Sequence, residues 1–274
     1  MIHSIRLATA FALALLVVGC GPSPEWSGAQ DAGNKAYGNA NFPAAEAKFL
    51  VALAEAEGAW SKYPFVAISL DSLGLVYSQM ARYEEAEQAV RRSIDLTEDA
   101  VGARDSDYAT RLSNLGNILH RQKRDAEAIA VLERAVEIQE ESLGAFHPNT
   151  AISLNNLAEA LRGMGRTEEA ERNLRRAVDI AFSELGPGHP NYGVFLNNLA
   201  GALQDQGRHG EAQPKFEEAL GVLRAALGAQ HPTVARAMEE LAESYTATGQ
   251  FDAAGPMFAE ALAQTESVYG PEHP

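Results

Sequence analysis

One pattern, repeated every 42 residues, limits the fold of this chain more than any other feature of its sequence. The string LNNLA occurs at 154–158 and again at 196–200. His-Pro pairs begin at residues 147, 189, 231 and 273, and Asp105-Ser106 and Tyr63-Pro64 hold the same phase earlier in the chain. The same interval separates Gly102, Gly144, Gly186, Gly228 and Gly270. A constant period of this length is typical of solenoids and propellers, in which each unit is one supersecondary element.

Each unit has the periodicity of two helices rather than of four strands. Between 148 and 164, apolar side chains recur at steps of three and four residues, and a second such series runs from 168 to 185. Gly165 separates the two series, Gly186 follows the second, and a proline opens the next unit, as is typical of helix ends and helix starts. The pattern therefore predicts an all-α fold.

Small residues stand at fixed positions where two antiparallel helices would cross closely. In the first helix of each unit they are Gly74, Gly116, Ala158, Ala200 and Ala242. In the second helix they are Ala86, Ala128, Ala170, Ala212 and Ala254, followed seven residues later by Ser93, Ala135, Ala177, Ala219 and Ala261. Together with LNNLA, GR-x-EEAE and LG-x-x-HP, this pattern resembles the tetratricopeptide repeat (TPR), and more narrowly its kinesin-light-chain type.

The resemblance implies a right-handed α-α superhelical solenoid of about six TPR helical hairpins. Trp26, Gly33, Phe42 and Phe49 fall at the spacing of a shorter TPR unit, of about 34 residues, before the 42-residue units begin. We therefore expect a TPR array over 26–274, with units at about 26–59, 63–102, 105–144, 147–186, 189–228 and 231–270.

The first residues have the composition of an export signal. Arg6 is followed by an apolar run from Leu7 to Val18, which is too short to span a bilayer but suits a signal peptide over 1–19. Val17 to Cys20 resemble the lipobox of bacterial lipoproteins, which implies acylation of Cys20 and a short linker over 20–25. The alternative is an ordinary signal with Cys20 incidental. Since Gly21 replaces the aspartate that retains lipoproteins at the inner membrane, the resemblance favours the periplasmic face of the outer membrane.

The TPR resemblance also implies where a ligand would bind. The first helix of each pair lines a concave groove in such arrays, so Asn155 and Asn197 are the leading candidates for contacts with a peptide or helix. The other groove candidates are Asn117, Glu159, Arg162, Gln204, Glu239 and Glu243. As an alternative, the amides tie adjacent repeats together, as expected for Asn114, Asn156 and Asn198, which lie toward the neighbouring repeat. Acidic side chains at Asp71, Glu159, Asp205, Glu239 and Glu243 predict a ligand with basic character.

Several classes of function are disfavoured by the residues. A formal charge of −15 argues against a nucleic-acid partner, because phosphate binding needs clustered Lys and Arg. The histidines before proline lie one per repeat, too far apart for a shared metal ion, and we expect them to bind backbone groups at helix starts. No phosphate loop, His-Glu-x-x-His or Gly-x-Ser-x-Gly motif occurs. We expect no enzyme activity, cofactor, metal or small-molecule substrate.

The sequence thus predicts a membrane-anchored TPR lipoprotein that acts as an adaptor or assembly scaffold in the bacterial cell envelope. Its partners would be a protein or peptide ligand in the concave groove and a membrane bound through the lipid at Cys20. Two alternatives remain at this point: a structural subunit of an envelope complex that uses its convex face, and a regulator of a cell-wall enzyme.

Overall fold

The computed structural model describes residues 22–58 and 63–269, and these ranges fold as consecutive helical hairpins. The first helix of each pair is called the A helix here, and the second the B helix. The pairs are α2 (Pro24–Gly38) with α3 (Phe42–Gly58), α4 (Phe65–Gln79) with α5 (Tyr83–Val101), α6 (Ser106–Arg121) with α7 (Asp125–Ser142), α8 (Pro148–Gly163) with α9 (Thr167–Ile180), α10 (Pro190–Asp205) with α11 (His209–Leu227), and α12 (Pro232–Ala247) with α13 (Phe251–Tyr269). The expected all-α TPR solenoid is confirmed, with a π-helical turn, Ala181–Leu185, extending α9.

Histidine side chains begin three of the A helices. The Nδ1 atoms of His147 and His189 each accept a hydrogen bond from the backbone N–H two residues later, at 3.1 Å, and His231 does the same at 3.2 Å. These bonds satisfy one of the backbone donors that a helix start leaves free. The prediction for these histidines is confirmed, whereas His273 lies outside the described residues.

Glycines end the B helices in a conformation that excludes other residues. Gly102, Gly186 and Gly228 have φ between 84° and 89° with ψ between 154° and 163°. This is an extended conformation at positive φ and differs from the left-handed helical conformation in which glycine commonly ends a helix. A Cβ atom is strained there, so only glycine turns the chain into the next A helix at low cost.

The small residues mark the close crossings within each pair. A Cβ atom on Gly74 would lie 2.4 Å from Val90, and one on Gly116 would lie 2.3 Å from Leu132. The alanines at the equivalent positions of later units, Ala158, Ala200 and Ala242, are 0% exposed. One large apolar cluster runs from α5 to α13 between A and B helices, and two smaller clusters hold the first pair against α4 and α5.

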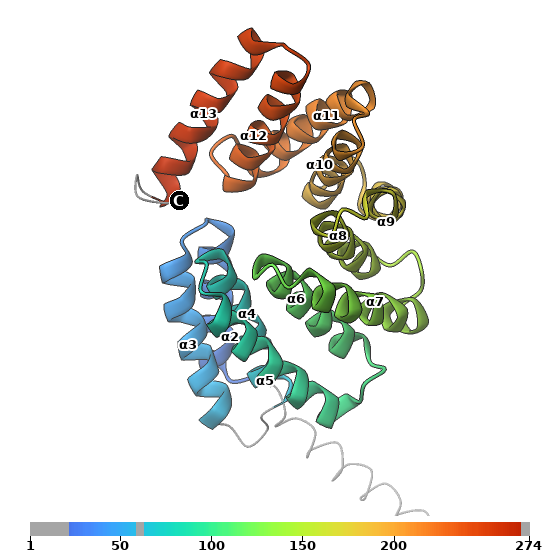
Figure 1. Cartoon of the computed structure of the whole chain (residues 1–274). Helices are drawn as coiled ribbons and strands as arrows, with labels where there is room; N and C mark the ends of the chain where they lie inside the picture. Colours follow the sequence, from blue (N-terminus) through green and yellow to red (C-terminus); the bar gives the residue numbers. More distant parts are fainter. Residues whose placement is uncertain (1–21, 59–62, 270–274) are drawn as a thin grey trace, which may run out of the picture.

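The stack curls so that its last pair returns toward its first (Figure 1). The A helices lie on the inner side of the curve and the B helices on the outer side. A cavity of about 350 Å³ between residues 38–40 and residues 227–232 marks where the first pair approaches the turn that joins the fifth and sixth pairs. No helix in 22–58 or 63–269 has both the length and the apolar character needed to cross a bilayer. The signal peptide and Cys20 lie outside the described residues.

Candidate functional site

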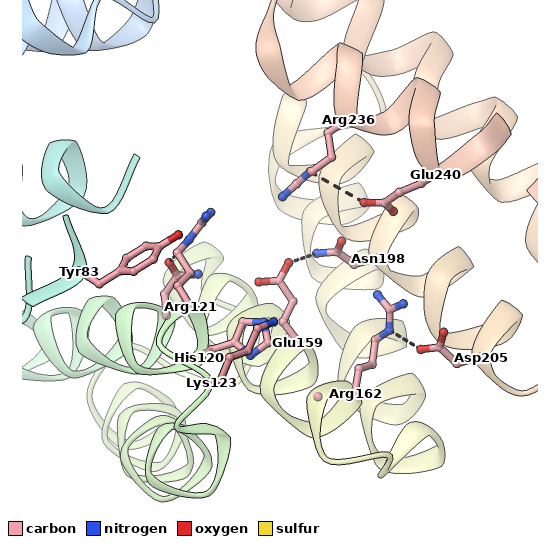
Figure 2. A pocket seen from close by; sticks show the side chains of 12 residues that line it. Tyr83, His120, Arg121, Lys123, Glu159, Arg162, Asn198, Asp205, Arg236 and Glu240 are labelled. Atoms are coloured by element: carbon pink, nitrogen blue, oxygen red, sulfur yellow. Dashed lines mark hydrogen bonds and ion pairs between the residues drawn. The ribbon is translucent and has the colours of Figure 1, made fainter. Parts of the chain in front are cut away.

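The inner surface of the curve contains a polar cavity of about 520 Å³. Its walls come mainly from four consecutive A helices, α6, α8, α10 and α12, as the TPR resemblance implied for the ligand groove. The lining residues are Tyr83, Asn117, His120, Arg121, Lys123, Glu159, Arg162, Gly163, Asn198, Asp205, Arg236 and Glu240. Figure 2 shows that the side chains labelled there project into one shared space. We call this surface the concave groove.

The groove continues toward the N-terminal pairs. A second cavity of about 460 Å³ shares Tyr83, Arg121 and Arg236 with the first and adds the end of α4 and the start of α12. Glu239 lines this second cavity, where burial, together with the neighbouring charge of Glu243, raises its pKa above the usual range. The combined surface is long and open, which suits an extended chain or a helix better than a compact small molecule.

Some basic side chains of the groove are already engaged by nearby carboxylates. The Nε atom of Arg162 lies 2.7 Å from Asp205. A Cβ atom on Gly201 would approach the Arg162 guanidinium to 2.7 Å, so this side chain is held flat against α10. His120 Nδ1 lies 2.6 Å from Asp125 Oδ1, with the His120 side chain 22% exposed. These groups are fixed by the fold.

Other cations have either no carboxylate partner or only a distant one among the described residues. Arg121 donates only to the amide oxygen of Asn117, at 3.3 Å, and no ion pair forms at Lys123. Arg236 makes one loose pair, 3.9 Å from Glu240. Figure 2 places Arg121 beside Tyr83 at one side of the groove, with Arg236 across from it. Charge that the fold leaves unpaired in a concavity is available to a ligand of opposite sign.

Lys123 is held in an unfavourable backbone conformation. Its φ is 63°, whereas Gly165, Gly207 and Gly249 occupy the same turn in the later units. A side chain at positive φ costs free energy that glycine avoids, and such strain is more common at functional sites than elsewhere. Ala81 shares the strain at φ 57° but carries no functional group. Lys123 therefore brings a free ammonium to the groove at some cost to the fold.

The structure places the two leading candidates differently from the prediction. Asn155 is 5% exposed and accepts a 2.8 Å bond from Asn198, and Asn197 is 2% exposed and donates a 2.6 Å bond to Glu240. Both amides are buried between A helices and do not reach the groove surface. The geometry therefore supports the alternative role, in which these amides tie adjacent repeats together, and a ligand contact at either residue would require these bonds to break.

The bonds form a ladder along the stack, here called the amide ladder. Each joins a residue of one A helix to the residue 43 positions later on the next, and the rungs are Ser113–Asn156 at 3.1 Å, Asn155–Asn198 at 2.8 Å and Asn197–Glu240 at 2.6 Å. Of the remaining candidates, Asn117, Glu159 and Arg162 line the first cavity. Gln204 is half-buried and Glu243 exposed, and neither lines the two cavities above.

The predicted basic ligand does not agree with the charges that the structure leaves free. Asp71 is paired with Arg111 in the interior, Asp205 is paired with Arg162, and Glu159 accepts a 2.8 Å bond from Asn198. The first cavity holds four Lys or Arg residues against three Asp or Glu residues, in a chain whose formal charge is −15. The groove is thus locally more positive than the molecule. The number of acidic residues along the helix face did not predict this positive charge, because most of those acids are already bonded to other side chains.

The sequence reasoning missed several groove residues, among them Tyr83, Arg121, Lys123, Arg236 and Glu240. Arg121 stands at the end of an A helix and Lys123 in the turn after it, and both positions had been interpreted only as a helix boundary. The signal for Lys123 was present, because it takes the position that glycine holds in the following units. Among the described residues no three His, Cys, Asp or Glu side chains gather as a metal site would require.

The comparison with known families agrees with the fold. Residues 107–181 and 191–267 match one tetratricopeptide repeat model, and residues 66–107 match a second. The chain therefore belongs to the tetratricopeptide repeat family. Proteins of this family are generally interaction scaffolds rather than enzymes. Among curated proteins, none matches the sequence significantly.

Several solved structures resemble this one. The kinesin light chain TPR-like repeats from Podosopora anserina are 25% identical, with a TM-score of 0.57, over 73% of this chain and 94% of that one. BtubC (BKLC) from P. vanneervenii is 20% identical, with a TM-score of 0.64, over 84% and 92%. A Rap protein complexed with Competence and Sporulation Factor is 12% identical, with a TM-score of 0.65, over 90% and 78%. The last two likenesses show the fold alone. The repeats are thus of the kinesin-light-chain type.

Proposed function

We propose that this protein is an adaptor that binds a peptide or helix of another protein in its concave groove. The observation that carries the proposal is a groove lined by four consecutive A helices, in which Arg121 and Lys123 have no carboxylate partner among the described residues. Charged groups left unpaired at a concave surface add specificity and speed of association when a partner supplies the opposite charge. The favoured ligand is therefore an extended or helical segment that carries carboxylates.

The groove has two regions with different charge: one is neutral and polar, and the other is lined by arginines. Arg162 and Asp205, which are paired at 2.7 Å, form a neutral polar floor. Arg121 and Arg236 line both cavities, so a segment lying along the groove would pass between them. Tyr83 offers an aromatic ring at the same place for stacking or apolar contact. These groups specify charge and shape along a chain, which is the requirement of an adaptor.

A peptide-binding measurement tests this function. The probe is a fluorescent peptide of about 15 residues with alternating Glu and Leu, a length that suits a groove of several helices. We expect it to bind the full chain, and we expect Arg121→Ala with Lys123→Ala to weaken binding by about tenfold or more at low salt, as lost charge pairs in a partly enclosed site would.

The matched control removes the same charge from the outer surface, by Arg172→Ala with Lys215→Ala, and should leave binding within about twofold. Thermal melting of both double variants should resemble that of the parent. Equal binding by all three proteins would contradict groove recognition and favour the structural-subunit alternative, in which the convex face and the ends of the stack matter.

We also propose that the chain is exported and anchored by lipid at Cys20, with the array held close to the periplasmic face of the outer membrane. The support is the sequence alone: the apolar run from Leu7 to Val18 and the single cysteine that follows it. Two or more acyl chains at one residue give durable anchoring. Labelling cells with radioactive palmitate should mark the parent protein and leave Cys20→Ser unlabelled, and an unlabelled parent would contradict the anchor.

With the envelope location proposed above, regulation of a cell-wall enzyme is a second candidate function, because such a regulator would use the same groove. Crosslinking in whole cells followed by mass spectrometry distinguishes the two. An assembly factor should be linked to a subunit of an envelope machine, and a regulator to a hydrolase or a synthase. In both cases the crosslinks should decrease when Arg121 and Lys123 are replaced, since both roles depend on the groove.

A further inference from the structure

The outer side of α3, the B helix of the first unit, is apolar. Leu50 is 45% exposed and Val51 is 51% exposed, although both have large apolar side chains. Smaller exposed apolar residues lie on the same side of the helix, and together they follow the i, i+4, i+7 and i+11 spacing with which one helix packs on another. We call this surface the α3 face, and its residues are Pro43, Ala47, Leu50, Val51 and Ala54.

The later units carry charged side chains on the equivalent face. A Cβ atom on Gly33 would lie 2.4 Å from Phe49, just as one on Gly74 would lie 2.4 Å from Val90, and these close crossings align unit one with unit two. In units two to five, the counterparts of Leu50 are Arg91, Glu133, Arg175 and Glu217, and those of Val51 are Arg92, Arg134, Arg176 and Glu218. The counterparts of Leu50 are all exposed, so neighbouring repeats do not cover this face. Its apolar character is particular to unit one.

The edge of α3 at the start of the stack has the opposite character. In unit two, Ala89 and Leu96 pack against the preceding unit, in an apolar cluster that includes Ala56. Their counterparts in α3 are Lys48 and Glu55, which are exposed. A terminal repeat needs such polar residues on its outer end to stay soluble. The apolar surface therefore lies on the convex side of the first unit and not at the end of the stack.

The composition of the α3 face fits a partner helix better than a lipid surface. A helix that lies in a bilayer interface is typically rich in Lys and Arg on its polar side and in Trp, Phe and Leu on the other. In α3 there is one Lys against three Glu, and no aromatic residue lies on the α3 face. Ala47 and Ala54 allow the backbone of a second helix to approach closely, and Leu50 and Val51 fill the space between them.

The charges along one flank of the α3 face are self-complementary. Lys48 and Glu55 form no ion pair within residues 22–58 and 63–269. They are seven residues apart, so they lie on the same side of the helix, about two turns from each other. When two copies of α3 pack antiparallel about a twofold axis near Val51, each flank meets the same flank of the other copy. Lys48 of each copy then lies opposite Glu55 of the other.

The remaining charges permit this contact. On the other flank, Glu46 is paired with Arg82 at 2.8 Å and Glu57 is paired with Arg92, so no free acid meets a free acid there. The formal charge of −15 on each chain opposes association, but exposed charges are screened over a Debye length of about 8 Å at physiological salt. Figure 1 shows no helix outside α3 on its side of the stack, so a second copy can reach the α3 face.

We propose that two copies of this chain associate through their α3 faces, as an antiparallel pair of helices. One helix pair buries less than the roughly 1,200 Å² of a standard stable interface, so the dimer is weak in solution. Copies confined to one membrane surface associate at a higher effective concentration, a consequence that rests on the lipid anchor proposed above. The dimer carries two concave grooves and therefore holds a partner with two binding segments more tightly than one copy does.

Disulfide crosslinking of the full chain, in the cells that produce it, tests the proposal. Val51→Cys places a thiol near the twofold axis, and a disulfide forms there only when the two Cα atoms come within about 7 Å of each other. Mild oxidation should give about tenfold more covalent dimer than in the parent, whose only cysteine is Cys20. The matched control, Arg176→Cys, places the thiol at the equivalent exposed position of unit four and should stay at the parent level.

Further changes in the Val51→Cys protein test the pairing. Lys48→Glu should reduce the covalent dimer by about fivefold, because two pairs of opposite charge become two pairs of like charge. Adding Glu55→Lys to this variant should restore the dimer. Leu50→Arg, which gives unit one the side chain that unit two has, should reduce the dimer by about tenfold or more. Phe146→Arg, the matched control at a side chain that is 74% exposed elsewhere, should leave it unchanged.

Several results would overturn the proposal. Val51→Cys could give no more dimer than the parent, or could be crosslinked to a different protein, which would assign the α3 face to that protein. Protection of Val51→Cys from a water-soluble maleimide without a crosslink would place the face in the bilayer instead. A charge exchange that fails to restore the dimer would exclude the antiparallel pair. Arg121→Ala with Lys123→Ala should leave the dimer intact, so failure of the groove and failure of the α3 face are separately visible.

Discussion

Two junctions between neighbouring units of the stack hold different kinds of side chain at equivalent buried positions. At the junction of units two and three, the ladder position holds Asp71, and the buried side chain opposite it is Arg111, whose Nε lies 3.3 Å from the carboxylate. At the junction of units four and five, the equivalent positions hold Asn155 and Phe195, and the rung is an amide pair. One junction is therefore charged and the other is neutral.

The charged junction is a small network in the interior. Arg111, only 4% exposed, donates from Nε to Ser93 Oγ at 2.9 Å and from Nη1 to the backbone oxygen of Asp107 at 2.8 Å. Ser93 in turn donates to the backbone oxygen of Ala67 at 2.9 Å. Burial raises the pKa of Asp71 to about 7, although Arg111 opposes the shift. The other four 42-residue units have alanine where unit two has Ser93, so this junction alone needs a hydroxyl there.

The neutral junction is simpler and better satisfied. Asn198, 3% exposed, donates to both Asn155 Oδ1 and Glu159 Oε1, each at 2.8 Å. Phe195 fills the space of Arg111 with apolar atoms and is 3% exposed. The repeat therefore determines where the rungs lie but not whether their side chains are charged. Burial raises the pKa of Asp71 at the junction of units two and three and also the pKa of Glu240 at the junction of units five and six, so stability that depends on pH should be concentrated at these two junctions.

The largest expected effect comes from breaking the charged junction. Arg111→Met should lower the free energy of unfolding by about 3–5 kcal/mol, because it leaves a buried carboxyl without its cation and removes two further hydrogen bonds. Chemical denaturation followed by circular dichroism measures the loss. Ser153→Ala, at the same position of unit four, should change stability by less than about 1 kcal/mol, because that hydroxyl has no hydrogen-bond partner.

A second expected effect is a dependence on pH that belongs to Asp71. Its pKa is raised from 3.8 to about 7, so the folded state binds more protons than the unfolded state between these values. Stability from this group is therefore fully present below pH 4 and declines as the pH rises through 7. The decline should be a few kcal/mol at most. Asp71→Asn should remove it, which the difference between the two denaturation series from pH 4 to 8 would show. Parallel series would contradict the raised pKa.

The neutral junction should respond less. Asn198→Ala takes the donor from Asn155 and leaves a buried amide oxygen unpaired, which costs about 1–3 kcal/mol. Because repeats unfold as coupled neighbours, hydrogen exchange should report the loss first in α8 and α10. Asn173→Ala, on the half-buried side of α9, should cost about 0.5 kcal/mol or less. A similar loss from both variants would mean that the rung contributes no more than an ordinary side chain.

The sequence predicts the fold well because its strongest signals are local and repeated. Each His-Pro pair and each terminal glycine determines a helix boundary within a few residues of itself, and the structure confirms this at His147, His189 and Gly186. Small residues such as Gly74 and Gly116 determine which faces cross, since any Cβ there would overlap a neighbour. Helix boundaries and close crossings are both determined by residues of the same unit, so a single sequence is enough to predict them.

The site is less predictable because it depends on contacts between units. Asn155 and Asn156 are adjacent, and a rotation of about 100° per residue turns Asn155 toward the next A helix and Asn156 toward the previous one, so that neither reaches the groove. That rotation is set by packing across the junction, which the sequence of one unit does not contain. Whether Arg162 or Lys123 is free likewise depends on a carboxylate about 40 residues away. Asp205 neutralises the first at 2.7 Å, and no acid pairs with the second in the described structure.

The smallest expected effect concerns the strained turn at Lys123. Lys123→Gly should raise the free energy of unfolding by about 1 kcal/mol or less, because glycine adopts φ 63° without the steric cost but gives up more conformational freedom on folding. The same change removes a free ammonium from the groove, so binding of the Glu-Leu peptide should weaken while the melting temperature rises. Ala40→Gly, which relieves similar strain (φ 55°) at a residue that lines neither groove cavity, should raise stability without changing affinity. If both variants are stabilised and both bind normally, the strain at Lys123 has no functional role, because the fold would then gain from glycine at no cost to recognition.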